Sequence, residues 1–161
     1  MWKRRNASLT IAAVGAAIVL TGCTDKTHGS EQTLKFIQPR GHTRNFGIIG
    51  RSSQKGLSPG SGFAFFAPLE NSATKLVGGV NAFCIATRPS PGKPIKGTCS
   101  GTAAVPGGTL ALSVGGALGN SVSGSIVGGT GKYAGATGTF SSVRRGGKNS
   151  PRIDTAHINL P

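Results

Sequence analysis

Short apolar stretches recur along most of this chain, and this pattern restricts the fold more than any other feature. The breaks between them hold Gly, Pro, Ser and Asn, the residues that favour tight turns. The 27 glycines are interleaved with Val, Ile, Leu, Phe and Thr and do not form polar tracts, which argues against disorder. After residue 22, no amphipathic helix pattern continues beyond two turns. These features predict a closed antiparallel barrel or a sandwich.

Nine strands are expected, each separated from the next by turn-forming residues. Their expected ranges are Leu34 to Gln38, Arg44 to Ile49, Gly62 to Ala67, Leu76 to Thr87, Lys96 to Val105, Thr109 to Val114, Val122 to Val127, Ala136 to Val143 and Ile153 to Leu160. Pro106-Gly107-Gly108 is expected to form a tight turn, because Pro sets φ and Gly supplies positive φ.

Residues 1–22 have the features of an export signal. A cationic start, Lys3 to Arg5, precedes an apolar run from Leu9 to Leu20, which is short for a bilayer core of roughly 30 Å. Leu20-Thr21-Gly22-Cys23 fits the lipobox of bacterial lipoproteins, in which the cysteine thiol is acylated. The alternative is an ordinary signal peptide in which Cys23 is incidental.

Under the lipoprotein interpretation the chain divides into three parts. Residues 1–22 are the signal peptide, residues 23–32 a lipidated tether, and residues 33–161 the folded domain. The tether assignment depends on the polar, aperiodic stretch that follows Cys23. We expect an exported protein, anchored through acylated Cys23 to membrane lipid on the extracytoplasmic side.

Cys84 and Cys99 remain as a pair in an oxidising compartment, where a disulfide is the expected state. Pro91-Gly92 lies midway between them, so a hairpin centred there places the cysteines opposite each other. The alternative is two buried free thiols. The cysteines are far apart in sequence and no histidine pair flanks them, so we expect neither a metal nor a cofactor.

The chain is strongly basic, with a formal charge of +14 that falls to +11 when Lys3, Arg4 and Arg5 leave with the signal. Such a charge on an anchored protein favours contact with anionic lipid headgroups or anionic envelope polymers. Alternatively, it only keeps a glycine-rich domain soluble. Nucleic acid is not expected as a partner, because the basic residues are scattered and the only Trp, Trp2, lies in the signal.

One stretch carries a resemblance to a known family. Ser125-Ile-Val-Gly-Gly-Thr-Gly-Lys-Tyr-Ala-Gly-Ala-Thr-Gly-Thr-Phe140 closely resembles the signature of the allene oxide cyclase and dirigent barrel superfamily. Gly62-Phe-Ala-Phe-Phe66, Val77-Gly-Gly-Val80 leading to Cys84, and Gly108-Thr-Leu-Ala-Leu-Ser113 support it, over roughly Thr33 to Leu160. The resemblance implies an all-β, eight-stranded antiparallel barrel with a cavity, often as a homotrimer.

Within this motif each residue type has an expected structural role. Gly128, Gly129 and Gly131 are expected to allow a sharp reversal, and Gly135 and Gly138 to relieve crowding where a tilted strand bends. Tyr133 is expected to plug one end of the barrel. A phosphate-binding loop is disfavoured, because the residues that follow are typical of a turn and a strand instead of a helix.

The resemblance implies cavity chemistry that this chain supports only weakly. Allene oxide cyclases rely on a largely apolar cavity, and dirigent proteins use acidic cavity groups. Beyond Cys23 the chain has four carboxylates, and two of them, Asp25 and Glu31, fall in the expected tether. Glu70, at a strand end, and Asp154 are weak catalytic candidates, and a surface or turn role is the alternative for each.

Strand periodicity predicts the direction of the polar residues near the C-terminus. Asp154 and Arg152 share the parity of Ala156, Ile158 and Leu160 and are expected to face the interior, whereas His157 has the opposite parity. An interior Asp154 would have a raised pKa, which a charge on Arg152 would counteract. His28 and His42 have no partner spacing and are expected to be solvated.

Two functions fit the sequence. The first is an envelope lipoprotein whose barrel binds an apolar small molecule or an envelope partner without catalysis. The second is an isomerase or cyclase that acts on an apolar substrate in the barrel cavity. The scarcity of carboxylates and the lack of a His-acid or Cys-His constellation favour the first.

Overall fold

The computed structural model describes residues 29–50, 52–53, 56–88, 95–147 and 150–161. The expected signal peptide and Cys23 lie outside the described residues. Within those residues, no helix is long and apolar enough to cross a membrane. All nine strands of the main sheet lie between Glu31 and Asn159.

Nine strands form one sheet, and two short ones form a separate ladder. The main sheet consists of β1 (Glu31–Gln38), β2 (Arg44–Ile49), β5 (Gly62–Glu70), β6 (Leu76–Arg88), β7 (Ile95–Val105), β8 (Gly108–Leu118), β9 (Ser121–Gly131), β10 (Thr137–Arg144) and β11 (Arg152–Asn159). The separate ladder consists of β3 (Ser52–Ser53) and β4 (Gly56–Leu57).

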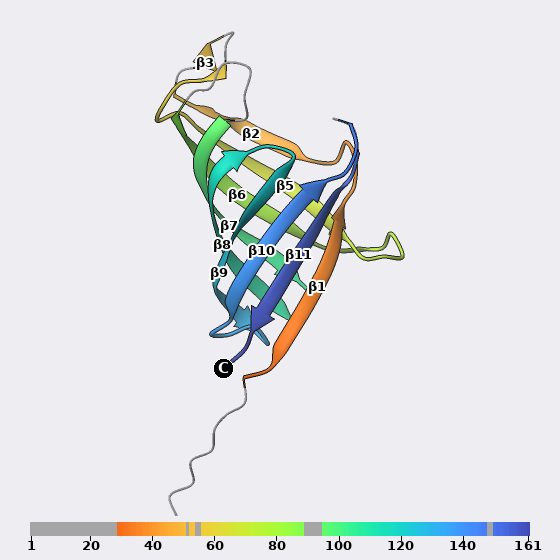
Figure 1. Ribbon diagram of the computed structural model, residues 1–161. Coiled ribbons are helices and arrows are strands. Elements are labelled where there is room, and N and C mark those ends of the chain that lie inside the picture. The colour runs from red at the N-terminus through yellow and green to blue at the C-terminus, as the bar shows by residue number, and fades with distance from the viewer. Residues whose placement is uncertain (1–28, 51, 54–55, 89–94, 148–149) are drawn as a thin grey trace, which may run out of the picture.

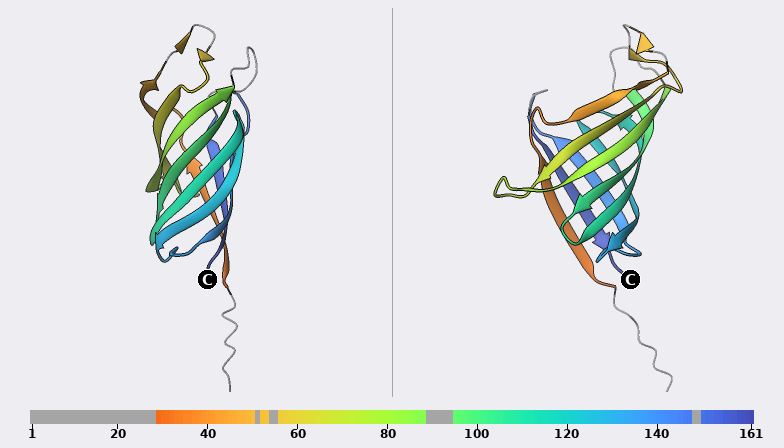
Figure 2. Two further views of the ribbon diagram at one scale, coloured as in Figure 1. Left: turned by 90° about the vertical axis from the view of Figure 1, so that its left-hand side faces the viewer. Right: turned by 180° about the vertical axis from the view of Figure 1, so that it is seen from behind.

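The main sheet closes into a barrel (Figures 1 and 2). From β5 to β11 each strand pairs antiparallel with the next along the chain, and β1 pairs antiparallel with β11 along its whole length. Ile37 of β1 also pairs with Glu70 of β5, which completes a ring of eight strands. Beside this contact, β2 pairs antiparallel with another part of β5, from Phe66 to Gly62. The eight-stranded antiparallel barrel is therefore confirmed, and the sandwich is excluded.

All nine expected strands are present, but the expected tether boundary is wrong. β1 begins at Glu31, where this residue pairs with Asn159, so Glu31 and Gln32 belong to the barrel and not to the tether. The alternation of exposed and half-buried residues already holds at these two positions. The polar side chains of Glu31 and Gln32 give no strand signal in the sequence. Backbone pairing with β11 places both residues in the strand.

The expected reversal at the glycine-rich motif is also misplaced. Gly128, Gly129 and Gly131 lie in β9 and pair with Ala111, Leu110 and Gly108. The reversal follows them, where Tyr133 N donates to Thr130 O and Ala136 N donates to Tyr133 O. A side chain at Gly129 would lie 2.5 Å from Tyr133 O, so close backbone approach explains this glycine.

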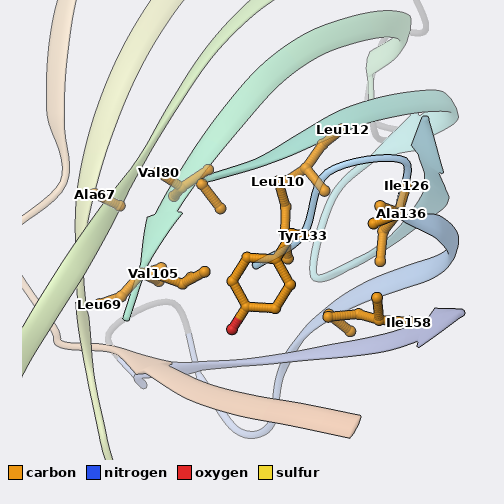
Figure 3. Packing of buried hydrophobic residues seen from close by; sticks show 12 residues of the cluster. Ala67, Leu69, Val80, Val105, Leu110, Leu112, Ile126, Tyr133, Ala136 and Ile158 are labelled. Carbon is orange, nitrogen blue, oxygen red and sulfur yellow. The ribbon is translucent and has the colours of Figure 1, made fainter. Parts of the chain in front are cut away.

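The hydrophobic core fills the end of the barrel at which β1 begins and β11 ends (Figure 3). Tyr133 lies in this core, and its hydroxyl donates to Pro106 O at 3.1 Å. The other large buried side chains of the cluster are Leu69, Val80, Val105, Leu110, Leu112, Ile126 and Ile158. This end of the barrel is therefore packed closed.

The predicted disulfide is present. Cys84 and Cys99 are directly opposite each other in the β6–β7 pair, and their sulfur atoms are 2.03 Å apart. The expected turn at Pro91-Gly92 lies outside the described residues. The free-thiol alternative is excluded.

Candidate functional site

A cavity of about 250 Å³ occupies the other half of the barrel interior. It lies toward the end where β1 finishes, near the start of β2 and the turn between β8 and β9. Its lining residues are Gln38, Thr43, Asn45, Phe63, Phe65, Val80, Ala82, Cys84, Cys99, Gly101, Leu112, Val114, Leu118, Gly119, Val122, Phe140, Ser142, Arg144 and Arg152. The volume is slightly below the range of about 300–1,000 Å³ typical of small-molecule pockets.

The apolar wall of the cavity is built by strand pairing between large and small residues. Across β5, β6, β7 and β8, Phe65 pairs with Ala82, Ala82 with Gly101, and Gly101 with Leu112. The two small residues in the middle of this row leave space that the outer two do not fill. A side chain at Gly101 would lie 2.5 Å from Asn81 O, so the strand contact itself keeps this position small.

The next row along the same strands contains the disulfide. Phe63 pairs with Cys84, Cys84 with Cys99, and Cys99 with Val114. The Phe63 and Phe65 rings are stacked, with centroids 6.3 Å apart. The disulfide therefore forms part of the cavity wall, besides joining β6 to β7.

The opposite wall, formed by β1, β10 and β11, is polar. Ser142 pairs with Asp154, and Arg144 pairs with Arg152. Arg152 also pairs with Gln38 of β1. Because these residues share the inward-facing parity of their strands, their side chains converge on the interior.

Arg152 is held in place by hydrogen bonds to its neighbours. Its Nε donates to Ser142 Oγ at 2.9 Å, its Nη2 to Ser142 O at 3.0 Å, and its Nη1 to Gly119 O at 3.0 Å. All three nitrogens are therefore engaged, and the side chain connects β11 with β10 and with the β8–β9 turn.

Arg144 differs from Arg152 in its bonding. Its Nε is buried and has no hydrogen-bond partner. A buried donor without a partner costs free energy, because it has lost water and gained nothing in exchange. Arg144 is thus an unsatisfied group of the polar wall, and it lies at the cavity.

Asp154 lies below the polar wall, at the boundary between cavity and core, and its side chain is 3 % exposed. Its Oδ2 accepts a hydrogen bond from Gln38 Nε2 at 2.7 Å, whereas its Oδ1 has no partner. Burial raises the pKa of this carboxyl, although hydrogen bonds from Ser142 and Gln38 and the charge of Arg152 act to lower it. The interior position expected from parity is confirmed.

The surroundings of Asp154 explain why burial dominates its pKa. Asp154 also lines a void of about 10 Å³, and every other residue that lines this void is apolar. A buried water needs a site of at least about that size with two or more polar partners, which this void does not offer. Apart from Asp154 itself, the lining of this void is therefore apolar.

The other candidate residues lie outside the cavity. Glu70 ends β5 at the barrel seam, where it pairs with Ile37 and Leu76, and it does not line the cavity. His157 is exposed, and its Nδ1 lies 3.0 Å from Thr33 Oγ1. His42 is exposed, and His28 lies outside the described residues.

The glycine-rich motif lies mostly at the packed end, away from the cavity. Gly135 adopts a φ of 72° in the turn after Tyr133, and Gly138 lies in β10 opposite Ile158. None of the six residues singled out in the motif lines the cavity. The motif therefore forms the closed end of the barrel, and the candidate site is at the other end.

Sequence reasoning missed Gln38, Ser142 and Arg144 as site residues. A signal for Arg144 was available, since it shares the parity of Phe140 and Ser142, but the strand was expected to end one residue earlier, at Val143. The groups of histidine, cysteine, aspartate and glutamate that a metal ion requires are absent from the described residues.

Comparison with known proteins shows similarity in structure and not in sequence. No protein-family profile and no curated protein matches the sequence. A pterocarpan synthase dirigent protein matches with a TM-score of 0.64 at 18% identity, over 96% of this chain and 97% of that chain. The chain has the dirigent-like barrel fold. Figure 1 shows the closed ring of strands on which this likeness depends.

Two solved structures that are named as enzymes also match the barrel of this chain. A pyocyanin demethylase matches with a TM-score of 0.61 at 18% identity, over 79% of this chain and 99% of that chain. An exo-specific intermolecular Diels-Alderase matches with a TM-score of 0.59 at 15% identity, over 81% of this chain and 99% of that chain. At these identities the likeness establishes the dirigent-like fold alone.

Proposed function

We propose that this protein is a lipid-anchored envelope protein whose dirigent-like barrel binds an apolar small molecule in its cavity. The observation that carries the proposal is the cavity itself, which is lined by Phe63, Phe65, Val114 and the Cys84–Cys99 disulfide. A concave, mostly apolar site with a few convergent polar groups is typical of a ligand pocket. The names of the structural neighbours, a demethylase and a Diels-Alderase, support a barrel interior that takes small molecules.

The anchoring part of the proposal depends on the sequence. Leu20-Thr21-Gly22-Cys23 follows a charged and apolar export segment, and acylation of Cys23 would attach the barrel to membrane lipid. A homotrimer and contact between the basic surface and an anionic envelope polymer remain predictions. Neither is required for ligand binding in the cavity.

A cavity-filling variant tests the ligand site. Val122 lines the cavity on β9, and Val127 on the same strand is 61% exposed. We expect Val122→Phe to weaken binding of the neutral probe 2-naphthamide by roughly tenfold or more, about 1.4 kcal/mol, and Val127→Phe to leave it unchanged. Isothermal titration calorimetry on the chain from residue 24 onward measures both. Equal affinity in the two variants would contradict binding in the cavity.

The second candidate function, an isomerase or cyclase, is favoured by one observation. Asp154 is buried, its Oδ1 is unpartnered, and burial raises its pKa, so it holds a proton to higher pH than an exposed aspartate. A carboxyl that holds its proton more firmly is better suited to act as a general acid. Turnover of a candidate substrate that is lost in Asp154→Asn, with ligand binding retained, would favour this function over binding alone.

A further inference from the structure

We propose that the cavity selects an amphipathic anion, a compact apolar ring system that carries one carboxylate, and that Arg144 binds the carboxylate. This inference rests on the proposed function, because it names the chemical class of ligand for the same cavity. It depends on the different bonding of the two arginines, on the charge balance of the polar wall and on the placement of that wall opposite an aromatic one.

The two arginines of the cavity differ in whether their guanidinium nitrogens have hydrogen-bond partners. Arg152 directs its three nitrogens to Ser142 and to the carbonyl of Gly119. Arg144, its direct cross-strand neighbour, has a buried Nε without a partner. A carboxylate can accept from Nε and a terminal nitrogen of one guanidinium together, which is the strongest geometry for this pair. A carboxylate in the cavity would supply the acceptor that Nε lacks, once the Arg144 side chain has rotated to expose this buried nitrogen.

The charge balance of the polar wall also favours an anion. Both arginines line the cavity, and each contributes a guanidinium cation to it. Among the residues that the structure describes, the acidic group beside them is Asp154, whose Oδ2 accepts from Gln38 and whose pKa is raised, mainly by burial. Burial lowers the pKa of Arg152, and the charge of Arg144 lowers it further. Two cations thus lie near one carboxyl whose pKa is raised by burial, and a bound anion would neutralise the excess positive charge.

The placement of the groups sets the orientation of the ligand. Arg144 is the last residue of β10, and Arg152 is the first residue of β11, so both lie at the open end of the cavity. Phe63, Phe65 and the disulfide form the facing wall, on β5, β6 and β7. A ligand would therefore place its rings against the aromatic wall and its carboxylate beside Arg144, near the entrance.

A matched pair of probes tests the inference without knowledge of the natural ligand. The anion 2-naphthoate and the neutral amide 2-naphthamide have almost the same shape, so their affinities differ mainly through charge. We expect the chain from residue 24 onward to bind 2-naphthoate roughly tenfold to a hundredfold more tightly, as for a hydrogen bond to a charged group. Isothermal titration calorimetry at constant ionic strength gives both dissociation constants.

Two arginine variants locate the preference. Arg144→Gln should remove the preference, because the affinity for naphthoate should fall to that for the amide. A far-ultraviolet circular dichroism spectrum shows whether this variant is folded. Arg145→Gln removes the same charge from the next residue, which is exposed in the turn after β10, and should keep the preference. Arg144→Lys retains the charge but not the paired donors, so it should keep only part of the preference.

The outcomes separate this inference from the proposed function. Equal affinity of the unaltered chain for the two probes would overturn the anion preference and leave apolar binding in place. An equal loss of preference in Arg145→Gln and Arg144→Gln would overturn the role of Arg144, because overall charge would then be the cause. Failure of the unaltered chain to bind either probe would contradict the inference and the proposed function together.

Discussion

At the scale of single residues, strand parity predicted the direction of side chains but not their partners. Asp154 and Arg152 were expected inside because they alternate with Ile153, and both face the interior. Whether Asp154 meets Gln38 depends on the pairing of β1 with β11, which joins residues 116 apart in sequence. The unpartnered Nε of Arg144 follows from contacts that no local pattern encodes.

The raised pKa of Asp154 predicts a pH-dependent stability. The native carboxyl holds its proton to higher pH than the unfolded chain, whose aspartate pKa is about 3.9. At pH values above about 3.9, the native state therefore holds more protons than the unfolded state does. The free energy of unfolding accordingly falls as the pH rises, until the native pKa has been passed. Asp154→Asn removes this titration while its side-chain oxygen can still accept from Gln38 Nε2.

We therefore expect Asp154→Asn to increase the free energy of unfolding at pH 7 relative to the unaltered chain, and to lose this advantage below about pH 3.9. Urea unfolding between pH 3 and pH 8 measures the difference. A difference that does not vary with pH would show that the native carboxyl titrates as it does in the unfolded chain.

At the scale of elements, the hairpins were the part of the fold that sequence located best. The midpoint of Cys84 and Cys99 at Pro91-Gly92 predicted their direct pairing, because hairpin register follows from the position of the turn. The β9–β10 connection was misplaced, since glycine marks both turns and close strand contacts. Gly129 serves the second purpose, where its backbone approaches Tyr133 O.

The disulfide should contribute substantially to the stability of the barrel. It joins residues 15 apart in sequence, and a loop of that length contributes about 3 kcal/mol in the chain-entropy account. We expect the double variant Cys84→Ala, Cys99→Ala to lose about that much free energy of unfolding in urea. Reduction of the unaltered chain should reproduce the loss, and reductant should not affect the variant. A loss well below about 1 kcal/mol would contradict this role.

At the scale of the whole molecule, the barrel was predictable but its division into two halves was not. The sequence shows strands and inward-facing residues, but the cavity exists because Ala82 and Gly101 lie side by side between Phe65 and Leu112. The end that contains Tyr133 is packed (Figure 3), and the cavity lies toward the other end. That division depends on how rows of side chains from distant segments coincide.

The anchoring of the whole molecule has a direct test. We expect Cys23→Ser to move the protein from the membrane fraction to the soluble fraction, because the thiol that would carry the lipid is lost. Fractionation of cells that produce either form, followed by immunoblotting, measures the change. Cys84→Ala, which keeps Cys23, is the matched control and should remain with the membrane. Unchanged membrane association of Cys23→Ser would contradict lipid anchoring.

The packed end of the barrel is also the end from which the chain leads back toward Cys23, since β1 begins there (Figure 1). Under the proposed anchoring, the packed end of the barrel would face the bilayer, and the entrance to the cavity would face away from the lipid. Its ligand would then exchange with the surrounding water and not by lateral diffusion from the acyl chains. In that orientation the barrel would bind and release molecules that are dissolved outside the membrane, while the protein itself stays at the membrane surface.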